Sequence, residues 1–276
     1  MSQKSILITG CSSGIGYTCA HGLHKLGYDV FATCRKEADV ERLKSEGLNA
    51  FRLDLRDTKS MEEALVWMLS HTNGRIDVLF NNAAYGQPGA VEDLKKEVLR
   101  EQFETNVFGT QELTNLVIPY MRKQKSGRII YNSSILGFVA MSYRGAYNAS
   151  KFAIEGLADT LRLELHKSGV EVVLLEPGPI RSDFRKNALA KFLEHIDQEN
   201  SAHREVYAKT LARLQKSGDA PFTLGSEAVL EVLLHAIEAK NPKARYGVTF
   251  PTKLFAWLKR FLPTSFMDTL ARKAGE

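Results

Sequence analysis

The stretch Ser5-Ile-Leu-Ile-Thr9-Gly10-Cys-Ser-Ser-Gly14-Ile15-Gly16 decides the fold of this 276-residue chain. Its first five residues form a short apolar run, which predicts a buried strand, and glycines follow at positions 10, 14 and 16. Apolar residues at 15, 19, 23 and 26 then repeat with the period of a helix until Gly27, where a helix would end. A second apolar run, Val30-Phe-Ala32, completes a unit of strand, glycine turn, helix and strand.

This glycine turn has the chemistry of a dinucleotide site. A helix that begins directly after a strand directs its free N–H groups and the positive end of its dipole at a pyrophosphate. Glycine turns the chain and lets phosphates and neighbouring backbone approach closely. We therefore predict that Gly10, Gly14 and Gly16 hold a dinucleotide. The alternative is a glycine-rich turn in some other α/β protein.

The end of the second predicted strand indicates which dinucleotide is bound. Enzymes that use NAD usually place a carboxylate there to bind the ribose 2′-hydroxyl, whereas arginine suits the 2′-phosphate of NADP. Here the strand ends in Thr33, Cys34 and Arg35, and the first acid is Glu37. Because a guanidinium can pair with phosphate oxygens, we predict NADP(H) as the cofactor, and the Ser12 hydroxyl could bind the same 2′-phosphate. The alternative is that Arg35 is an ordinary solvated arginine at the end of a strand.

The rest of the chain repeats the alternation of strand and helix. Apolar runs occur at 5–9, 29–33, 49–53, 76–80, 128–132 and 170–175, with helical patterns between them, and 243–249 predicts a final strand. Such runs predict an α/β fold, a Rossmann-type doubly wound parallel sheet with helices on both faces. Since no linker interrupts the pattern, we expect one dinucleotide-binding domain over residues 1–276.

Tyr147 and Lys151 supply candidate catalytic chemistry. Two residues four apart lie on one face of a helix, about 6 Å apart along its axis. A lysine ammonium beside a phenol favours the phenolate, so we expect the pKa of Tyr147 to be lowered toward neutrality. Ser134, in the run Arg128-Ile-Ile-Tyr-Asn-Ser-Ser134, can hydrogen-bond a carbonyl oxygen while the tyrosine exchanges its proton. The alternative is a surface helix with a solvated lysine.

These motifs resemble the classical short-chain dehydrogenase/reductase family from Lys4 to about Ser182. The resemblance implies a catalytic tetrad of Asn106, Ser134, Tyr147 and Lys151, with Asn106 in the run Thr105-Asn-Val-Phe-Gly-Thr110 holding a water next to Lys151. Ser133 is an alternative active hydroxyl, but the thirteen-residue spacing to Tyr147 favours Ser134.

The same resemblance implies further contacts with the cofactor. Asp54 would hydrogen-bond the adenine amino group, and the segment from Pro177 to Ser182 would lie along the nicotinamide carboxamide. The run Asn81-Asn82-Ala83 matches the family's fourth-strand motif, but Ala84 stands where the family usually has glycine. The complete set of expected cofactor-binding residues is Gly10, Ser12, Ser13, Gly14, Ile15, Gly16, Arg35, Asp54, Leu55, Asn81, Ala83, Tyr147, Lys151, Pro177, Gly178, Ile180 and Ser182.

The segment of about 183–224 leaves the repeating pattern and predicts a helical substrate lid. It carries two charged helical stretches, near 185–196 and 199–217, and follows the sixth strand where open α/β sheets bind ligands. Six apolar residues could line a substrate pocket there: Phe138, Met141, Tyr143, Phe184, Leu189 and Phe192. For Leu189 and Phe192, packing of the lid on the body is an equally good explanation.

We therefore expect hydride transfer between NADP(H) and an apolar aldehyde or ketone, or the corresponding alcohol, with Tyr147 as general acid/base. Within the family the chain most resembles bacterial NADP-dependent aldehyde reductases, which are related to hydroxysteroid and retinol dehydrogenases. This closer resemblance lies in the runs Val30-Phe-Ala-Thr-Cys-Arg35, Glu176-Pro-Gly-Pro-Ile-Arg-Ser182 and Ala244-Arg-Tyr-Gly-Val-Thr249. The alternatives are a hydroxysteroid, retinol or hydroxyacyl dehydrogenase of the same family, or a non-catalytic NADPH-binding module.

Composition argues against several other classes. The net charge of +5 is scattered, so we expect no nucleic-acid partner, and the seven histidines show no metal-ligand spacing, so we expect no metal. An odd count of three cysteines and no leader pattern predict a cytoplasmic protein. The C-terminal extension of about 251–273 includes a basic amphipathic stretch, which predicts a helix packed on the domain, on a partner subunit or on a membrane surface. The resemblance implies a homodimer or homotetramer through helices near 100–124 and 145–167.

Overall fold

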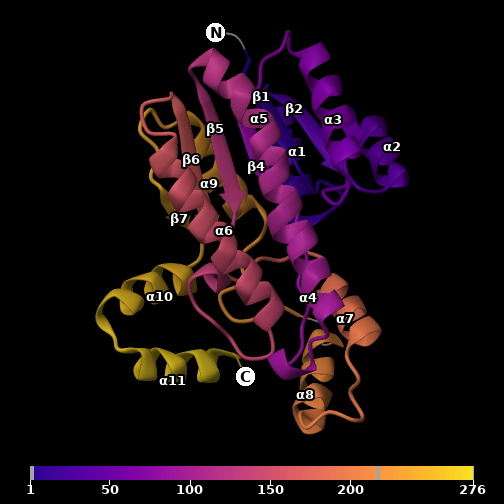
Figure 1. The fold of residues 1–276 in the computed structure, drawn as a ribbon, viewed down its shortest axis with the longest axis vertical. Helices are drawn as coiled ribbons and strands as arrows, with labels where there is room; N and C mark the ends of the chain where they lie inside the picture. Colours follow the sequence, from indigo (N-terminus) through magenta and orange to yellow (C-terminus); the bar gives the residue numbers. More distant parts are fainter. Residues whose placement is uncertain (1–2, 216–217, 276) are drawn as a thin grey trace.

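A parallel sheet of seven strands is the centre of the computed structural model, which describes residues 3–215 and 218–275 (Figure 1). The strand order is β3-β2-β1-β4-β5-β6-β7, and every neighbouring pair is parallel. This arrangement confirms the predicted doubly wound sheet. The strands are β1 (Ser5–Ile8), β2 (Asp29–Cys34), β3 (Asn49–Arg52), β4 (Val78–Asn81), β5 (Gly127–Asn132), β6 (Val170–Glu176) and β7 (Arg245–Gly247).

Side chains from each strand enter two separate cores, because successive residues of a strand point to opposite faces. Ile6 and Ile8 pack with α1 and α9, whereas Leu7 between them packs with α3, α5 and α6. Figure 1 shows α5 and α6 in front of the sheet and α9 behind it. These helices are α1 (Gly14–Lys25), α3 (Thr58–His71), α5 (Thr110–Gln124), α6 (Gly145–Glu164) and α9 (Glu227–Glu238). Covered on both faces, β1 and β4 are buried along their whole length.

The remaining short elements lie mostly around the carboxyl ends of the strands. They are α2 (Glu37–Ser45), the 3-10 turn η1 (Val91–Asp93), α4 (Lys96–Phe103), the π-helical turn η2 (Glu104–Gly109) and the 3-10 turn η3 (Ile135–Gly137). A π-helical turn inside a longer helix frequently marks a functional position. Here η2 joins α4 to α5 and contains the candidate residue Asn106.

The predicted lid consists of α7 (Phe184–His195) and α8 (Arg204–Gln215). The helix expected over 199–217 begins five residues late, because Asp197 accepts hydrogen bonds from the backbone N–H groups of Glu199 and Asn200 and forms a turn there. Positions 216 and 217 of that predicted helix lie outside the described residues. The lid is fastened to the body through Tyr207, whose hydroxyl bonds the Asp93 carboxylate and accepts the N–H of Ala90 at 2.9 Å.

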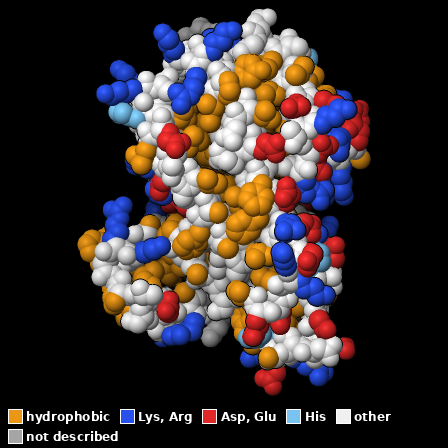
Figure 2. Space-filling view, viewed as in Figure 1, with side chains coloured by type: hydrophobic (Ala, Val, Ile, Leu, Met, Phe, Trp, Pro, Cys, Tyr) orange, Lys and Arg blue, Asp and Glu red, His pale blue; other side chains and the backbone are white. Residues whose placement is uncertain are grey.

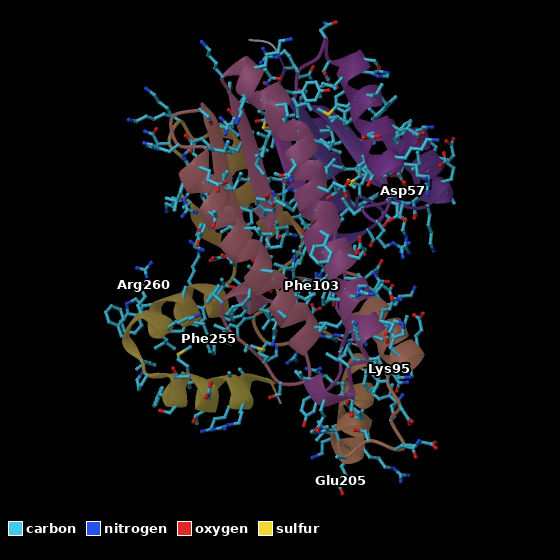
Figure 3. All side chains as sticks on the ribbon, in the orientation of Figure 1. Asp57, Lys95, Phe103, Glu205, Phe255 and Arg260 are labelled. Atoms are coloured by element: carbon cyan, nitrogen blue, oxygen red, sulfur yellow. The ribbon has the colours of Figure 1, made fainter. Side chains whose placement is uncertain are left out.

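The expected final strand, 243–249, is shorter in the structure. The N–H of Lys243 donates to the Tyr246 hydroxyl at 3.0 Å, and Thr249 caps the next helix, so only residues 245–247 pair with β6. That helix, α10 (Phe250–Phe261), and α11 (Thr264–Gly275) form the C-terminal extension. Figure 1 shows the two helices as a separate projection from the body, and Figure 3 places Arg260 at its outer edge.

None of the helices in the described ranges combines the length and the apolar character that a membrane crossing requires.

Candidate active site

The turn after β1 brings three segments of backbone into close contact. Gly10 adopts φ +72°, in the left-handed region that favours glycine, and a Cβ atom there would lie 2.9 Å from the Cα atom of Ala83. At Gly16 a Cβ atom would lie 2.2 Å from the carbonyl oxygen of Gly10. The first turn of α1 contains no acidic side chain that would repel a phosphate. These features fit a dinucleotide pyrophosphate.

A hydrogen-bond network fixes this turn to the end of β4. The Thr9 hydroxyl accepts the N–H groups of Asn82 and Ala83, each at 3.0 Å. The Asn82 amide donates to the carbonyl oxygens of Thr9 at 2.9 Å and Gly10 at 3.2 Å, and its own oxygen accepts from Asn132 Nδ2 at 2.9 Å. The glycine turn is therefore held rigidly to the carboxyl ends of β4 and β5.

Asn82 and Asn132 are the site residues that the sequence prediction missed. The prediction selected Asn81 instead, but the Asn81 amide donates to Thr114 Oγ1 on α5 at 2.9 Å, so its side chain is directed away from the glycine turn. Alternation along the strand explains this difference, since adjacent side chains point to opposite faces. Asn82 and Asn132 could have been found in the sequence, because each is a polar residue at the carboxyl end of one of two neighbouring parallel strands, where ligands bind.

Lys151 extends the same network from α6. It is buried, and its Nζ atom donates to the backbone oxygen of Asn132 at 2.6 Å. Burial lowers the pKa of the Lys151 amine to about 8, and the Glu155 carboxylate one helical turn later opposes this shift. The amine is therefore poised to change its charge near neutral pH.

Tyr147 lies beside Lys151, as the four-residue spacing predicts. The Lys151 Nζ atom is 5.6 Å from the centroid of the Tyr147 ring. Burial raises the pKa of the Tyr147 phenol, and a hydrogen bond with Ser134 offsets this rise only in part. The expected net lowering of the Tyr147 pKa toward neutrality is wrong for this arrangement. The ammonium faces the aromatic ring and the Asn132 carbonyl, and desolvation of the phenol dominates.

Ser134 and Ser133 point to different neighbours. Ser134 hydrogen-bonds Tyr147, and its Oγ atom accepts the N–H of Leu136 at 3.1 Å. Ser133 instead interacts with the Glu155 carboxyl, and its Oγ would lie 2.6 Å from a Cβ atom at Gly137. The geometry therefore agrees with the choice of Ser134 as the hydroxyl beside Tyr147.

Asn106 approaches the pair from η2. Its Nδ2 atom donates to the Tyr85 carbonyl at 2.9 Å and to Ser150 Oγ at 3.1 Å, while its oxygen accepts the Tyr85 N–H at 3.2 Å. The Ser150 hydroxyl in turn donates to the Tyr147 carbonyl at 2.8 Å. Asn106 is thus connected to the backbone of α6 at the candidate tyrosine rather than directly to the Lys151 amine.

The residues that are expected to bind the adenosine part of the cofactor lie at the ends of β2 and β3. Arg35 is exposed directly after β2, and its charge acts on Asp54, which follows β3. Burial would raise the pKa of Asp54, but hydrogen bonds and the charge of Arg56 outweigh it, so the pKa is lowered. Leu55 is buried, and its carbonyl oxygen would lie only 1.7 Å from a Cβ atom at Gly109. A carboxylate and two guanidinium groups therefore face one another at this end of the site.

The remaining predicted cofactor residues converge from two sides. Ser182 faces the glycine turn, since a Cβ atom at Gly14 would lie 2.9 Å from the Ser182 Cβ. The carbonyl of Pro177 accepts the Ile135 N–H at 2.8 Å, which joins this segment to the residue after Ser134. Gly178 packs against Thr249, and Ile180 pairs with Leu224 at the end of the lid. Ser12, Ser13 and Ile15 lie in the turn itself and at the start of α1.

The apolar candidates for the substrate pocket lie in different surroundings. The Phe184 ring meets the Tyr147 ring edge to face, with centroids 5.1 Å apart. Phe192 is fully buried against Tyr207 and Ala90, so it packs the lid on the body, and Tyr143 contacts Tyr207 in the same cluster. Leu189 and Met141 are partly buried, and Phe138 packs under α10.

Within residues 3–215 and 218–275, no group of three or more His, Cys, Asp or Glu side chains has the arrangement of a metal site. Two of the predicted groups come together in the structure: a glycine turn that fits a dinucleotide, and a Ser, Tyr and Lys cluster beside it. This arrangement can hold a proton donor next to a bound nicotinamide.

Comparisons with known proteins agree with this site. A family model described as short chain dehydrogenase matches residues 4–192, a range that contains every candidate catalytic residue. The chain is 40% identical over 268 residues to an uncharacterized oxidoreductase, YbbO, of Escherichia coli (strain K12), covering 97% of this chain and 94% of that protein. It is 34% identical over 279 residues to a 3-ketodihydrosphingosine reductase of Bacteroides thetaiotaomicron, covering 99% and 98%.

Among solved structures, a short-chain dehydrogenase from Streptomyces avermitilis superimposes with a TM-score of 0.76. It is 27% identical, and the match covers 94% of this chain and 97% of that one.

Proposed function

This chain belongs to the short chain dehydrogenase family of NAD(P)(H)-binding oxidoreductases, and from that membership we propose that it reduces apolar aldehydes or ketones with NADPH or oxidises the corresponding alcohols with NADP+. The observation that carries the proposal is the convergence of Ser134, Tyr147 and Lys151 beside the glycine turn.

Tyr147 is the general acid of the reduction. A proton donor must begin protonated, and the raised pKa keeps the phenol in that form at neutral pH. The bound reduced nicotinamide would supply the hydride. The Tyr147 proton passes to the substrate oxygen, and the nearby Lys151 ammonium stabilises the phenolate that remains. Ser134 donates to the same substrate oxygen and orients it.

NADP(H) is favoured over NAD(H) by the charges at the adenosine end. Arg35 is exposed at the end of β2, where a carboxylate would be needed to grip a ribose 2′-hydroxyl. The nearby Asp54 carboxylate already accepts from Arg56 at 3.1 Å. A 2′-phosphate would therefore meet guanidinium groups rather than a free carboxylate.

The substrate is proposed to be apolar because Phe184 borders Tyr147 and is partly exposed. The relative from Bacteroides thetaiotaomicron is by its name a reductase of a 3-keto compound, which supports reduction of a ketone. Hydroxysteroid, retinol and hydroxyacyl substrates share the same chemistry and are therefore alternatives that the experiment below separates.

We also propose a homodimer or homotetramer formed through α5 and α6. Figure 2 shows hydrophobic side chains on this face of the molecule, and Phe108 on η2, directly before α5, and Leu157 and Leu163 on α6 are exposed. Single exposed apolar residues are common, but a group of this kind on one face indicates an interface. Light scattering of the purified chain measures the oligomeric state directly.

A substrate panel tests the proposed function. We expect absorbance loss from NADPH with aliphatic aldehydes and long-chain ketones, and slower turnover with NADH. The panel includes a hydroxysteroid, retinol and a 3-ketoacyl thioester, each measured in both directions. Preferred oxidation of one of these alcohols would replace aldehyde and ketone reduction with that alternative. NADPH binding without turnover of any compound would indicate a non-catalytic module.

A further inference from the structure

Helix α10 carries apolar side chains on two opposite faces. Its inner face buries Thr252 and Phe255, and Phe255 packs with Ile135 and Val139 on the body of the protein. Its outer face presents four large side chains to solvent, with exposed fractions of 60% for Phe250, 38% for Leu254, 60% for Trp257 and 68% for Phe261. Spacings of four, three and four residues place all four on one side of a helix.

The end of the lid extends this apolar strip. Phe222 is 63% exposed, and its ring centroid lies 5.6 Å from that of Phe250. At the other end of the strip the rings of Trp257 and Phe261 are 5.2 Å apart. We call Phe222, Phe250, Leu254, Trp257 and Phe261 the α10 surface. A contiguous exposed apolar patch of this kind marks an interaction site.

Basic side chains accompany the α10 surface. Lys253 and Arg260 are exposed and lie four residues before and three residues after Trp257, so they border the apolar strip on the same helix. From Phe250 to the C-terminus the sequence has five basic and two acidic residues, which supplies +3 of the net charge of +5. Figure 2 shows Lys and Arg side chains beside hydrophobic ones on this projection. The partner of this surface is therefore expected to be anionic.

We propose that the α10 surface docks on the surface of a bilayer that contains anionic lipids. Trp and Phe side chains partition into the boundary between headgroups and acyl chains, and flanking Lys and Arg side chains bind anionic headgroups. A helix of 12 residues is too short to span a bilayer, so it lies in the plane of the surface. A second copy of the chain fits less well, because two equally basic surfaces would face each other.

The docking site adjoins the candidate active site. Helix α10 packs on η3, which begins directly after Ser134, and Lys259 on α10 donates to the carbonyl of Phe138. Gly178, in the predicted nicotinamide segment, packs against Thr249 at the start of α10. If the proposed function holds, docking would bring the candidate active site to a surface in which apolar carbonyl compounds dissolve.

Vesicle sedimentation of the full chain tests the docking independently of turnover. We expect binding to vesicles of equimolar phosphatidylcholine and phosphatidylglycerol, and much weaker binding to pure phosphatidylcholine. The variant Lys253→Ala/Arg260→Ala should bind about 25-fold more weakly, since each basic residue near an anionic surface contributes about fivefold. Trp257→Ser/Phe261→Ser should weaken binding by at least about tenfold.

Matched controls lie elsewhere on the surface. Leu26→Ser and Lys59→Ala change residues that are also well exposed, and both should leave vesicle binding unchanged. The chain has two tryptophans, so in a Trp67→Phe background the fluorescence reports Trp257 alone. Its emission should shift to the blue on anionic vesicles and be quenched by brominated lipid.

Three results would overturn the docking proposal: no vesicle binding, equal binding to neutral vesicles, or equal losses in the control variants. Self-association that Trp257→Ser/Phe261→Ser abolishes, without vesicle binding, would instead assign the surface to a second copy. Circular dichroism of each variant establishes that it is folded. If the unchanged protein turned over substrate but bound no vesicles, the docking would be rejected and the proposed function would stand.

Discussion

The Nζ atom of Lys151 donates to the backbone oxygen of Asn132 at 2.6 Å, and this contact joins α6 to the carboxyl end of β5. Asn132 in turn donates from its side chain to Asn82, which holds the glycine turn. The candidate catalytic lysine and the candidate dinucleotide turn therefore belong to one hydrogen-bonded unit. A shift of either would be transmitted to the other, and the predictions below follow from this connection and from the charges around it.

Arg35→Ala should remove the preference for NADPH. Loss of a charge-assisted pair with the 2′-phosphate costs about 1.5–3 kcal/mol, which predicts about a 10-fold to 150-fold rise in KM for NADPH. KM for NADH should change little, because that cofactor lacks the phosphate. Steady-state kinetics with both cofactors measure the ratio, and Lys36→Ala, at the next exposed position, is the control. An unchanged preference in Arg35→Ala would assign the 2′-phosphate to other residues.

The rate of carbonyl reduction should fall as the pH rises through about 8. Burial lowers the pKa of Lys151 to about 8, so its ammonium, which stabilises the Tyr147 phenolate, is lost above that pH. Because the Glu155 carboxylate raises this pKa, Glu155→Gln should move the alkaline limb of kcat/KM to lower pH. Asp159→Asn is the control, since Asp159 shares Arg245 with Glu155. Equal shifts in the two variants would remove Glu155 from this role.

Glu176 should make folding stability depend on pH. Arg245 is shared by Glu155, Asp159 and Glu176, and burial with the neighbouring Glu155 charge raises the pKa of Glu176 to about 7. The unfolded chain releases this proton near pH 4.5, so between these pH values the native state binds more protons. The contribution of Glu176 to the free energy of unfolding is therefore full below the unfolded pKa and is lost as the pH rises through about 7.

Urea denaturation at pH 5 and at pH 7.5 measures the free energy of unfolding before and after the contribution of Glu176 is lost. The difference between the two free energies of unfolding should be smaller in Glu176→Gln than in the unchanged protein. A variant that retains the whole difference would show that another group is responsible.

The sequence predicted the sheet and most of the site because each depends on local pattern. The runs that became β1 to β6 are short and apolar, and Tyr147 and Lys151 needed only helical spacing to meet. Their mutual electrostatics could not be predicted, since the pKa of Tyr147 is set by burial and by Ser134, which arrives from a different element.

Other differences arose from contacts between distant residues. Phe192 became a packing residue because Tyr207 and Ala90 enclose it, and the late start of α8 depends on a side-chain turn at Asp197. The C-terminal extension was predicted to contain an amphipathic helix, but the contact of its Phe255 with Ile135 could be seen only in the fold. Residues that act through a partner far along the chain leave no periodic signal in the sequence.

Turnover by Tyr147→Phe tests the central claim most directly. The phenyl ring keeps the contact with Phe184, and only the hydroxyl that carries the proton is lost. We expect the rate of NADPH-dependent carbonyl reduction to fall by about 10²- to 10⁴-fold, the usual contribution of a general acid, while NADPH still quenches protein fluorescence with an unchanged Kd. A variant that turns over at the rate of the unchanged protein would contradict the assignment of Tyr147 as the proton donor.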